Sequence, residues 1–181
     1  MKTPSLSGKL IRLAVMNTEE DLEQWAAWFR NSEYQRLLDM GPAELYTPAQ
    51  IKEWLEKDLG TYTLFGIRTV DEDRLIGFVD LAGFDWSART AWTSIGIGSP
   101  EHWGKGYGTE AMCLLVAYAF ETVNLNRVNL NVFAYNERAF RSYLKCGFKE
   151  EGRLRQILLR NNQRWDMIYM GLLREEWKPG G

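Results

Sequence analysis

The chain has 181 residues, of which 45% are hydrophobic and 25% are charged, which suits one globular domain with a full core. Its formal net charge of −2 argues against a nucleic-acid partner, because such a partner needs a basic surface. The N-terminal stretch has no apolar signal core, and the longest apolar run, residues 111–120, is too short to span a bilayer. We therefore expect a single domain over residues 1–181, in the cytoplasm and without a membrane partner.

The first half of the chain begins with a predicted strand at residues 9–15 and a helix after it. Thr18 and Asp21 form a capping-box pattern at the helix start, and apolar residues then recur at helical spacing. Residues 31–46 contain acidic and aromatic side chains without clear periodicity. We expect this segment to be an irregular, solvated loop; the alternative that its position allows is the lining of a substrate cleft.

A second helix is predicted from its start signals, with Thr47 as the cap, Pro48 in the first turn and Gln50 three residues after the cap. Gly60 is expected to end it. Three strands follow, over residues 62–69, 74–84 and 89–98. The acidic turn between the first two is interpreted as a hairpin tip, since a calcium loop would need a glycine and a later Glu at set spacing.

In the second half, a helix that begins at Thr109 is apolar nearly all round, which predicts burial against a sheet. Asn136 caps a later helix, which Gly147 ends with Phe148 packing back. The remaining strands are expected at residues 127–134, 149–159 and 164–173, and the tail 175–181 is expected to be loose. This order predicts a mixed α/β (α+β) fold, with a strongly twisted central sheet of about seven strands and helices on both faces.

Cysteine and histidine usage bears on compartment and metal binding. Cys113 and Cys146 lack C-x-x-C spacing and fall in predicted helices, so we interpret them as buried free thiols of a cytoplasmic protein. The chain has one His and no Cys/His cluster, so we predict no metal site. Its eight Trp residues suggest aromatic walls around a cleft or an interface, although core packing is the default role.

The most informative stretch is the glycine loop after the strand at 89–98. Gly104, Gly106 and Gly108 fall at every second position, directly before the apolar helix. Such a loop leaves several backbone N–H groups unpaired at the positive end of a helix dipole, and glycine lets an anion approach them. It matches neither the P-loop nor the G-x-G-x-x-G dinucleotide fingerprint. We predict a phosphate or pyrophosphate site; the alternative is a glycine-rich turn without a ligand.

The stretch W-G-K-G-Y-G-T-E-A at residues 103–111 resembles the acetyl-coenzyme A pyrophosphate loop of the GNAT N-acetyltransferase superfamily. More narrowly, it resembles the Rim-type branch of ribosomal-protein N-terminal acetyltransferases, which often has Trp at this loop position. The resemblance extends over nearly the whole chain, and the order of predicted elements is that of a GNAT fold. It implies acetyl-CoA as co-substrate, without a metal, bound at Trp103, Gly104, Lys105, Gly106, Tyr107, Gly108 and Thr109.

Acyl transfer from a thioester to an amine needs a polarised carbonyl, a proton for the leaving thiolate and a deprotonated nucleophile. The resemblance implies that the strand before the loop splays from its neighbour, so that backbone groups of Gly96, Ile97 and Gly98 hold the pantetheine arm. An ordinary paired strand is the alternative. Tyr143, in Y-L-K-C-G-F, matches the family's Y-x-x-x-G-F and would protonate the coenzyme A sulfur; otherwise it is a core Tyr bonded to a backbone carbonyl. Asn136 is similar to the Asn that contacts the cofactor arm.

The third need has no assigned residue. Many relatives carry Glu in an A-E-x-G-I pattern before the loop, where this chain has A-W-T-S-I, and we place Trp92 at the Glu position. Asp80 could substitute for it, although a structural or surface role is the default. The same holds for Glu33, Asp85 and Asp166. His102 is interpreted as an anion contact or as a residue without a role. We expect deprotonation through ordered water, or direct use of the free amine.

These features predict an acetyl-CoA-dependent N-acetyltransferase that works by direct transfer in a ternary complex. The acceptor is a primary amine, either a protein N-terminus or a small molecule, and a homodimer is left open. The alternative function is a non-catalytic sensor that binds acetyl-CoA or another metabolite; the missing Glu favours it and Tyr143 opposes it. A covalent acyl-enzyme through Cys146 is a third hypothesis, which lacks an adjacent base.

Overall fold

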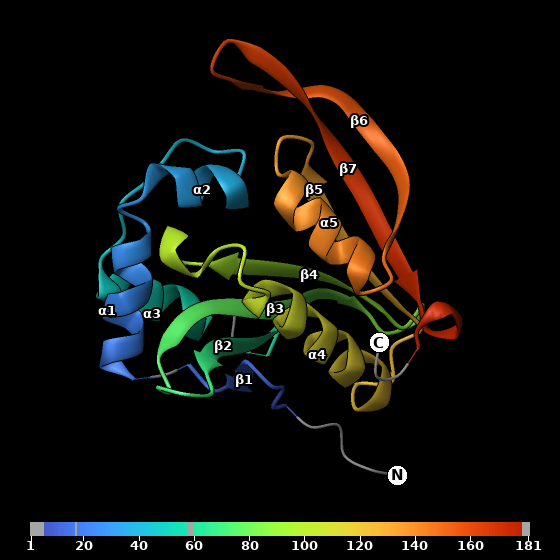
Figure 1. Cartoon of the computed structure of the whole chain (residues 1–181), viewed down its shortest axis with the longest axis horizontal. Coiled ribbons are helices and arrows are strands. Elements are labelled where there is room, and N and C mark those ends of the chain that lie inside the picture. The colour runs from blue at the N-terminus through green and yellow to red at the C-terminus, as the bar shows by residue number, and fades with distance from the viewer. Residues whose placement is uncertain (1–5, 17, 58–59, 179–181) are drawn as a thin grey trace.

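The computed structural model describes residues 6–16, 18–57 and 60–178. These residues form one seven-stranded sheet in the order β1-β2-β3-β4-β5-β7-β6, with helices on both faces (Figure 1). Strands β1 to β4 are antiparallel to one another, β5 runs parallel to β4, and β7 and β6 are again antiparallel. The predicted mixed fold with a seven-stranded central sheet is confirmed.

The elements follow the predicted order with one additional helix. They are β1 (Ile11–Ala14), α1 (Glu19–Trp28), α2 (Ser32–Leu38), α3 (Pro48–Lys57), β2 (Thr63–Thr69), β3 (Leu75–Asp85), β4 (Thr90–Ile97), η1 (Pro100–His102), α4 (Tyr107–Glu121), β5 (Arg127–Phe133), α5 (Glu137–Lys145), β6 (Lys149–Arg160), β7 (Gln163–Leu173) and η2 (Arg174–Glu176). The β6–β7 hairpin extends beyond the rest of the molecule at the top of Figure 1. None of the helices in the described ranges is long and apolar enough to cross a membrane.

The predicted helix starts are confirmed at α1 and α3. Thr18 accepts from the N–H of Asp21 at 3.1 Å, and the Asp21 carboxylate accepts in return from the N–H of Thr18. At α3, the N–H of Gln50 donates to Thr47 Oγ1, and Gln50 Oε1 accepts from the N–H of Thr47 at 2.9 Å. The predicted end of α3 at Gly60 falls next to residues 58 and 59, which lie outside the described ranges.

Helix α2 corrects the expectation of an irregular segment at 31–46. The Asn31 side chain caps it by accepting from the N–H groups of Glu33 and Tyr34, at 2.9 and 3.3 Å. Tyr34 is buried against Trp28 and Phe29, with ring centroids 6.1 and 5.9 Å away. A helix of seven residues has too few turns to show a periodic pattern, and its stability comes from such tertiary contacts.

The sheet separates two apolar cores. Helices α4 and α5 cover one face, where they pack on the alternate residues Val79 and Leu81 of β3. Helices α1 and α3 cover the other face, where Phe78 packs against Trp25. Because successive side chains of a strand point to opposite faces, β3 contributes to both cores. Figure 1 shows α1, α2 and α3 gathered on one side of the sheet, with α4 and α5 on the other.

Two further expectations need correction. Cys113 of α4 and Cys146 at the end of α5 are joined by a disulfide, so they are not free thiols, and Cys146 is not available as an acyl-enzyme nucleophile. The sequence could not show this, because the pairing depends on how two helices pack. The tail is ordered at its start: Trp177 packs on Phe120, with ring centroids 5.5 Å apart. Residues 179–181 of the predicted loose tail lie outside the described ranges.

Candidate active site

A cavity of about 340 Å³ lies between β4 and β5, with α4, α5 and α2 around it. Its origin is a divergence of the two strands. They pair only from Thr90 to Trp92 on β4 and from Arg127 to Asn129 on β5, and beyond this point each continues without the other. The splayed strand expected from the resemblance is therefore present in the structure. We call this space the cofactor cavity.

Most of the residues predicted for cofactor binding line the cofactor cavity. Those that do are Gly96, Ile97, Trp103, Gly104, Gly106, Tyr107, Gly108, Thr109 and Asn136, together with the predicted catalytic residue Tyr143. Gly98 and Lys105 are not among its lining residues. The structure thus brings the glycine loop, the end of β4 and the start of α5 to one place.

The backbone groups of β4 that point toward the cavity belong to residues other than Gly96 and Gly98. The N–H of Gly98 donates to the carbonyl of Ile76 on β3 at 2.9 Å. Because backbone groups alternate in direction along a strand, Gly96 and Gly98 face β3, whereas Ile95 and Ile97 face the open side. The Ile97 carbonyl accepts from Trp103 Nε1 at 2.7 Å. This corrects the expectation that all of 96–98 presents unpaired groups.

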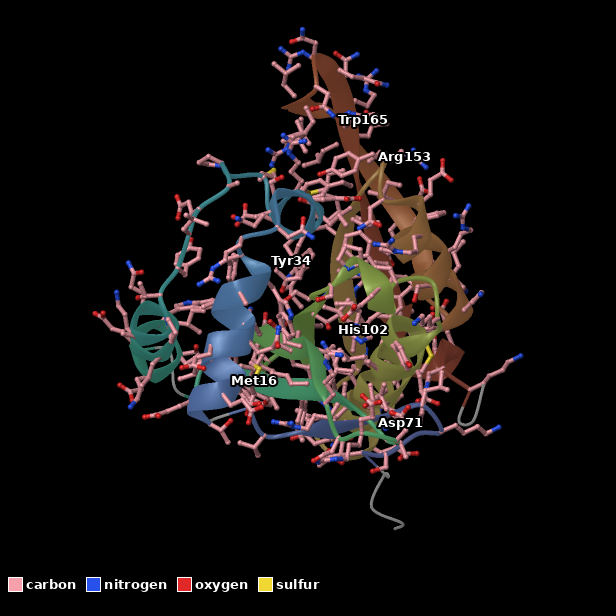
Figure 2. The ribbon with its side chains drawn as sticks, turned by 60° about the vertical axis from the view of Figure 1, so that its left-hand side comes forward. Met16, Tyr34, Asp71, His102, Arg153 and Trp165 are labelled. Atoms are coloured by element: carbon pink, nitrogen blue, oxygen red, sulfur yellow. A yellow bond between two sulfur atoms is a disulfide. The ribbon has the colours of Figure 1, made fainter. Side chains whose placement is uncertain are left out.

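The two glycines have a packing role instead. A Cβ on Gly96 would lie 2.7 Å from Phe78 Cε1 and 2.9 Å from the hydroxyl of Tyr34, and a Cβ on Gly98 would fall inside the ring of Trp28. The glycines of β4 therefore let α1 and α2 approach the sheet closely. Figure 2 shows Tyr34 between α1 and the strands; its hydroxyl is buried without a hydrogen bond to any described residue.

The glycine loop presents a run of free donors. Within the described chain, no backbone N–H from residue 104 to residue 109 donates to a protein acceptor; the first such bond of α4 runs from Glu110 to the carbonyl of Gly106, at 3.0 Å. Gly104 and Gly106 have φ of 75° and 91°, a region that favours glycine. The loop ends on the N-terminus of α4, which carries the positive end of the helix dipole. This arrangement can bind a phosphate group.

The loop is tied to α5 by contacts that the sequence did not reveal. Arg138 lies over the Trp103 ring, with its guanidinium carbon 4.2 Å from the ring centroid. Thr109 Oγ1 and Ser142 Oγ are 2.8 Å apart, which joins α4 to α5. Arg138 and Ser142 both line the cofactor cavity. Only the three-dimensional approach of α5 to the loop identifies them.

Tyr143 lies on the buried side of α5, and burial raises the pKa of its hydroxyl above the ordinary value. The group therefore stays protonated at neutral pH. Burial is the one cause of this shift, with no hydrogen-bond partner beside it among the described residues, so the structure gives no support to the alternative of a core Tyr bonded to a backbone carbonyl. Burial also lowers the pKa of His102, which favours its neutral form.

Three of the candidate bases, Asp85, Asp166 and Asp80, lie apart from the cofactor cavity. Glu33 of α2 lies near enough to Arg138, a lining residue, to oppose the lowering of its pKa by burial, but none of the described lining residues is itself acidic. Asp85 accepts hydrogen bonds from residues 87 and 88 of a turn, and Asp166 accepts from the N–H of Gln156. Trp92, at the expected Glu position, is 41% exposed and contacts Tyr169 edge to face. Asp80 lies on the opposite face of the sheet from α4.

Comparison with known proteins places this site in a family. The model of the acetyltransferase (GNAT) domain matches residues 11–149. The chain belongs to the GNAT acetyltransferase family, and its relatives are named N-acetyltransferases, so the protein is an N-acetyltransferase.

Two curated relatives illustrate the range of acceptors. The putative ribosomal N-acetyltransferase YdaF of Bacillus subtilis is 29% identical over 177 residues, covering 97% of this chain and 90% of that protein. The spermidine N(1)-acetyltransferase of Vibrio cholerae is 34% identical over 113 residues, covering 61% of this chain and 65% of that protein. The solved V. cholerae spermidine N-acetyltransferase in complex with CoA and spermine superposes with a TM-score of 0.81 at 25% identity, over 92% of this chain and 96% of that one.

Proposed function

We propose that the protein transfers the acetyl group of acetyl-CoA directly to a primary amine within a ternary complex. The run of free N–H groups at residues 104–109 carries this proposal, because it forms an anion site at the mouth of a cavity between two diverging strands. That the V. cholerae neighbour was solved with CoA supports the choice of anion. In this proposal the loop binds the pyrophosphate, and Trp103 holds the loop against Ile97.

The reaction follows from what the cavity offers. The amine nitrogen attacks the thioester carbonyl carbon, a C–N bond forms and the C–S bond breaks. Backbone N–H groups of Ile95 and Ile97, on the open side of β4, stabilise the negative charge on the carbonyl oxygen. Tyr143 donates its proton to the departing thiolate and is reprotonated from solvent, the neutral amine loses one proton to solvent as the amide forms, and CoA leaves as the thiol. Asn136 contacts the pantetheine arm while its side chain also caps α5.

The relatives support a class of acceptor and a class of assembly, but no particular amine and no particular number of subunits. The relatives include enzymes named for ribosomal proteins and for spermidine, so a protein N-terminus and a small amine are both acceptor classes of the proposal. The V. cholerae enzyme has been solved as a dodecamer, which supports a homodimer or a larger homo-oligomer here. Cytoplasmic location stays a prediction, and the disulfide between Cys113 and Cys146 removes one of its premises.

Calorimetry with acetyl-CoA tests the proposal at its base. Binding is expected, together with a rise in melting temperature by mass action. A chromatographic screen of amine pools, with release of free thiol as a second readout, then identifies the acceptor class. Absence of acetyl-CoA binding at millimolar concentration would overturn the proposal. Binding without thiol release from any pool would favour the sensor function.

A further inference from the structure

A second cavity, of about 480 Å³, lies on the face of the sheet that α1 and α3 cover. Its walls are aromatic to an unusual degree. Trp25 and Trp54 approach with ring centroids 5.7 Å apart, and the stacked rings of Phe84 and Trp86, 4.8 Å apart, form the opposite wall. Trp54 and Trp86 are 52% and 65% exposed, so they stand at the open end. We call this space the aromatic cavity.

Asp80 is the one acidic or basic side chain among the described residues that line the aromatic cavity. Its carboxylate accepts from the N–H of Ser94 at 2.9 Å and from Ser94 Oγ at 2.6 Å. A carboxylate offers about four lone-pair sites, so these two bonds leave it able to accept from a ligand. Burial raises its pKa, and no described lining residue of the aromatic cavity is a cation that could balance its charge.

The Asp80 end of the aromatic cavity adjoins the cofactor cavity. Phe78 lines the aromatic cavity, and its Cε1 lies only 2.7 Å from where a Cβ on Gly96, a residue of the cofactor cavity, would be. Ser94, which holds Asp80, precedes Gly96 by two residues on β4, a distance of about 7 Å along a strand. A ligand held at Asp80 would thus have its charged end toward the cofactor cavity and its body toward Trp54 and Trp86.

We propose that the aromatic cavity binds the amine acceptor, and that this acceptor carries one ammonium group on a compact apolar body. This inference rests on the proposed acetyl transfer. Aromatic faces attract organic cations and also bury apolar surface, and a single carboxylate balances a single charge. A polyamine would bring further ammonium groups into a cavity that has no second carboxylate among its described lining residues, at a cost in desolvation. Of a protein acceptor, only the first residue with its α-amino group would enter the aromatic cavity.

Benzyltrimethylammonium tests binding without chemistry, because it keeps its charge at every pH and cannot be acetylated. Titrated into the protein without acetyl-CoA, it should quench tryptophan fluorescence, since three Trp residues line the cavity. In the enzyme assay it should compete with the amine acceptor and not with acetyl-CoA. Saturating amounts that leave both the fluorescence and the acetylation rate unchanged would overturn the inference.

Three variants locate the site. Asp80→Asn keeps an oxygen for Ser94 but loses the charge, and it should weaken probe binding at least about tenfold, as expected for a charge-assisted contact. Trp86→Leu should weaken it about threefold to tenfold, and this exposed position gives a folded variant even if Asp80→Asn is unstable. Glu72→Gln, at the hairpin tip before β3, is the matched control and should bind as the wild type does. Equal affinity in all four proteins would overturn the assignment.

The substrate comparison separates this inference from the proposed function. Phenethylamine should be acetylated with a kcat/KM at least about tenfold above that of spermidine, because spermidine carries charges that Asp80 alone cannot balance. An enzyme that acetylates spermidine best and ignores benzyltrimethylammonium would refute the aromatic cavity as acceptor site while leaving acetyl transfer intact. Probe binding in a protein without affinity for acetyl-CoA would refute the proposed transfer, and with it the role of the probe site as acceptor site.

Discussion

In the proposed reaction, Tyr143 protonates the thiolate that leaves. Its raised pKa keeps the hydroxyl protonated, and a proton donor to the leaving group acts mainly in the transition state. Tyr143→Phe should therefore lower turnover by about a hundredfold or more while the acetyl-CoA dissociation constant stays within about threefold. Steady-state kinetics and calorimetry measure the two effects separately.

Tyr118→Phe is the matched control for this change. Tyr118 lies on α4, packs edge to face on Phe65 and is not among the residues that line the cofactor cavity. Its loss of a hydroxyl should leave turnover unchanged. If turnover of Tyr143→Phe also stays within about threefold of the wild type, Tyr143 is a packing residue and another group protonates the thiolate.

Substitution of Gly106 tests whether the glycine loop binds the phosphate of acetyl-CoA. Gly106 has φ of 91° and directly precedes α4, so a valine there is strained and its side chain would stand over the free N–H groups. Gly106→Val should weaken acetyl-CoA binding at least about tenfold in a protein whose circular dichroism is unchanged. Gly152→Val is the control, because a Cβ at Gly152 meets no atom within 4 Å. Equal affinity in both variants would place the phosphate elsewhere.

Helix α4 holds the N-terminal segment through a single side chain. The carboxylate of Glu110 accepts from the backbone N–H groups of Lys9, Leu10 and Ile11, each at 2.8 Å. Glu110→Ala would leave these donors without their partner and should lower the free energy of unfolding by about 1–3 kcal/mol. Urea unfolding measures this. Glu121→Ala, an exposed change at the other end of α4, should cost less than about 0.5 kcal/mol; similar losses in both variants would refute the anchoring role.

The disulfide joins α4 to α5 beside the cofactor cavity and closes a loop of 33 residues. In the chain-entropy account, a bond of this span stabilises the native state by about 2–4 kcal/mol. Reductant should therefore lower the unfolding midpoint of the wild type and leave that of a Cys113→Ser, Cys146→Ser double variant unchanged. Two thiols per chain that react in the native protein without reductant would contradict the bond.

What the sequence predicts well is local chemistry. The capping boxes at Thr18 and Thr47 and the cap at Asn136 involve atoms three residues apart, so they are visible in the letters themselves. The fold followed from the spacing of such signals and from the glycine loop. Helix α2 was not predicted, because only seven helical residues follow its capping residue Asn31.

What the sequence does not show is contact between distant segments. The disulfide, the stacking of Arg138 on Trp103 and the link from Thr109 to Ser142 all depend on how α4 and α5 pack. The role of Gly98 is similar, since only the structure shows the Trp28 ring against it. The eight Trp residues suggested an aromatic cleft, but their positions in the chain could not say which of them would meet.

At the scale of the whole molecule, the two candidate binding cavities use different strands of the same sheet. The cofactor cavity opens where β4 leaves β5, with α4, α5 and α2 around it, and the aromatic cavity lies on the α1 and α3 side of β2 and β3. The cationic residues of the cofactor cavity, Arg138, Arg141 and Lys145, favour an anionic cofactor, whereas Asp80 favours a cation on the other side. The two substrates would then bind at separate places without competing for charge, and the amine nitrogen must come into contact with the thioester before transfer.

This separation of charge leaves the acceptor without an assigned base, which has a consequence for pH dependence. A primary alkylamine has a pKa of about 10, so only about one molecule in a thousand is a free nucleophile at neutral pH. Asp80 as counter-ion binds the protonated amine, which has no lone pair, so this proton must pass to solvent before the nitrogen attacks the thioester. The catalytic efficiency with an alkylamine should therefore keep rising from about pH 6.5 to about pH 9; a protein N-terminus would bring the plateau down to about pH 8.

Asp80 adds a second limb to this dependence, in the same direction, because its charged form is also lost as the pH falls. Burial raises its pKa above the ordinary value, so the carboxylate is charged well above that pKa and becomes neutral as the pH falls through it. Affinity for benzyltrimethylammonium, which does not titrate, should accordingly be lost toward acidic pH in the wild type and be low and flat in Asp80→Asn. In that variant the KM for the amine should rise while the efficiency keeps its upward slope with pH. A wild-type plateau below about pH 7 that disappears in Asp80→Asn would instead make Asp80 the general base, because a base within the complex levels the rate above its own pKa.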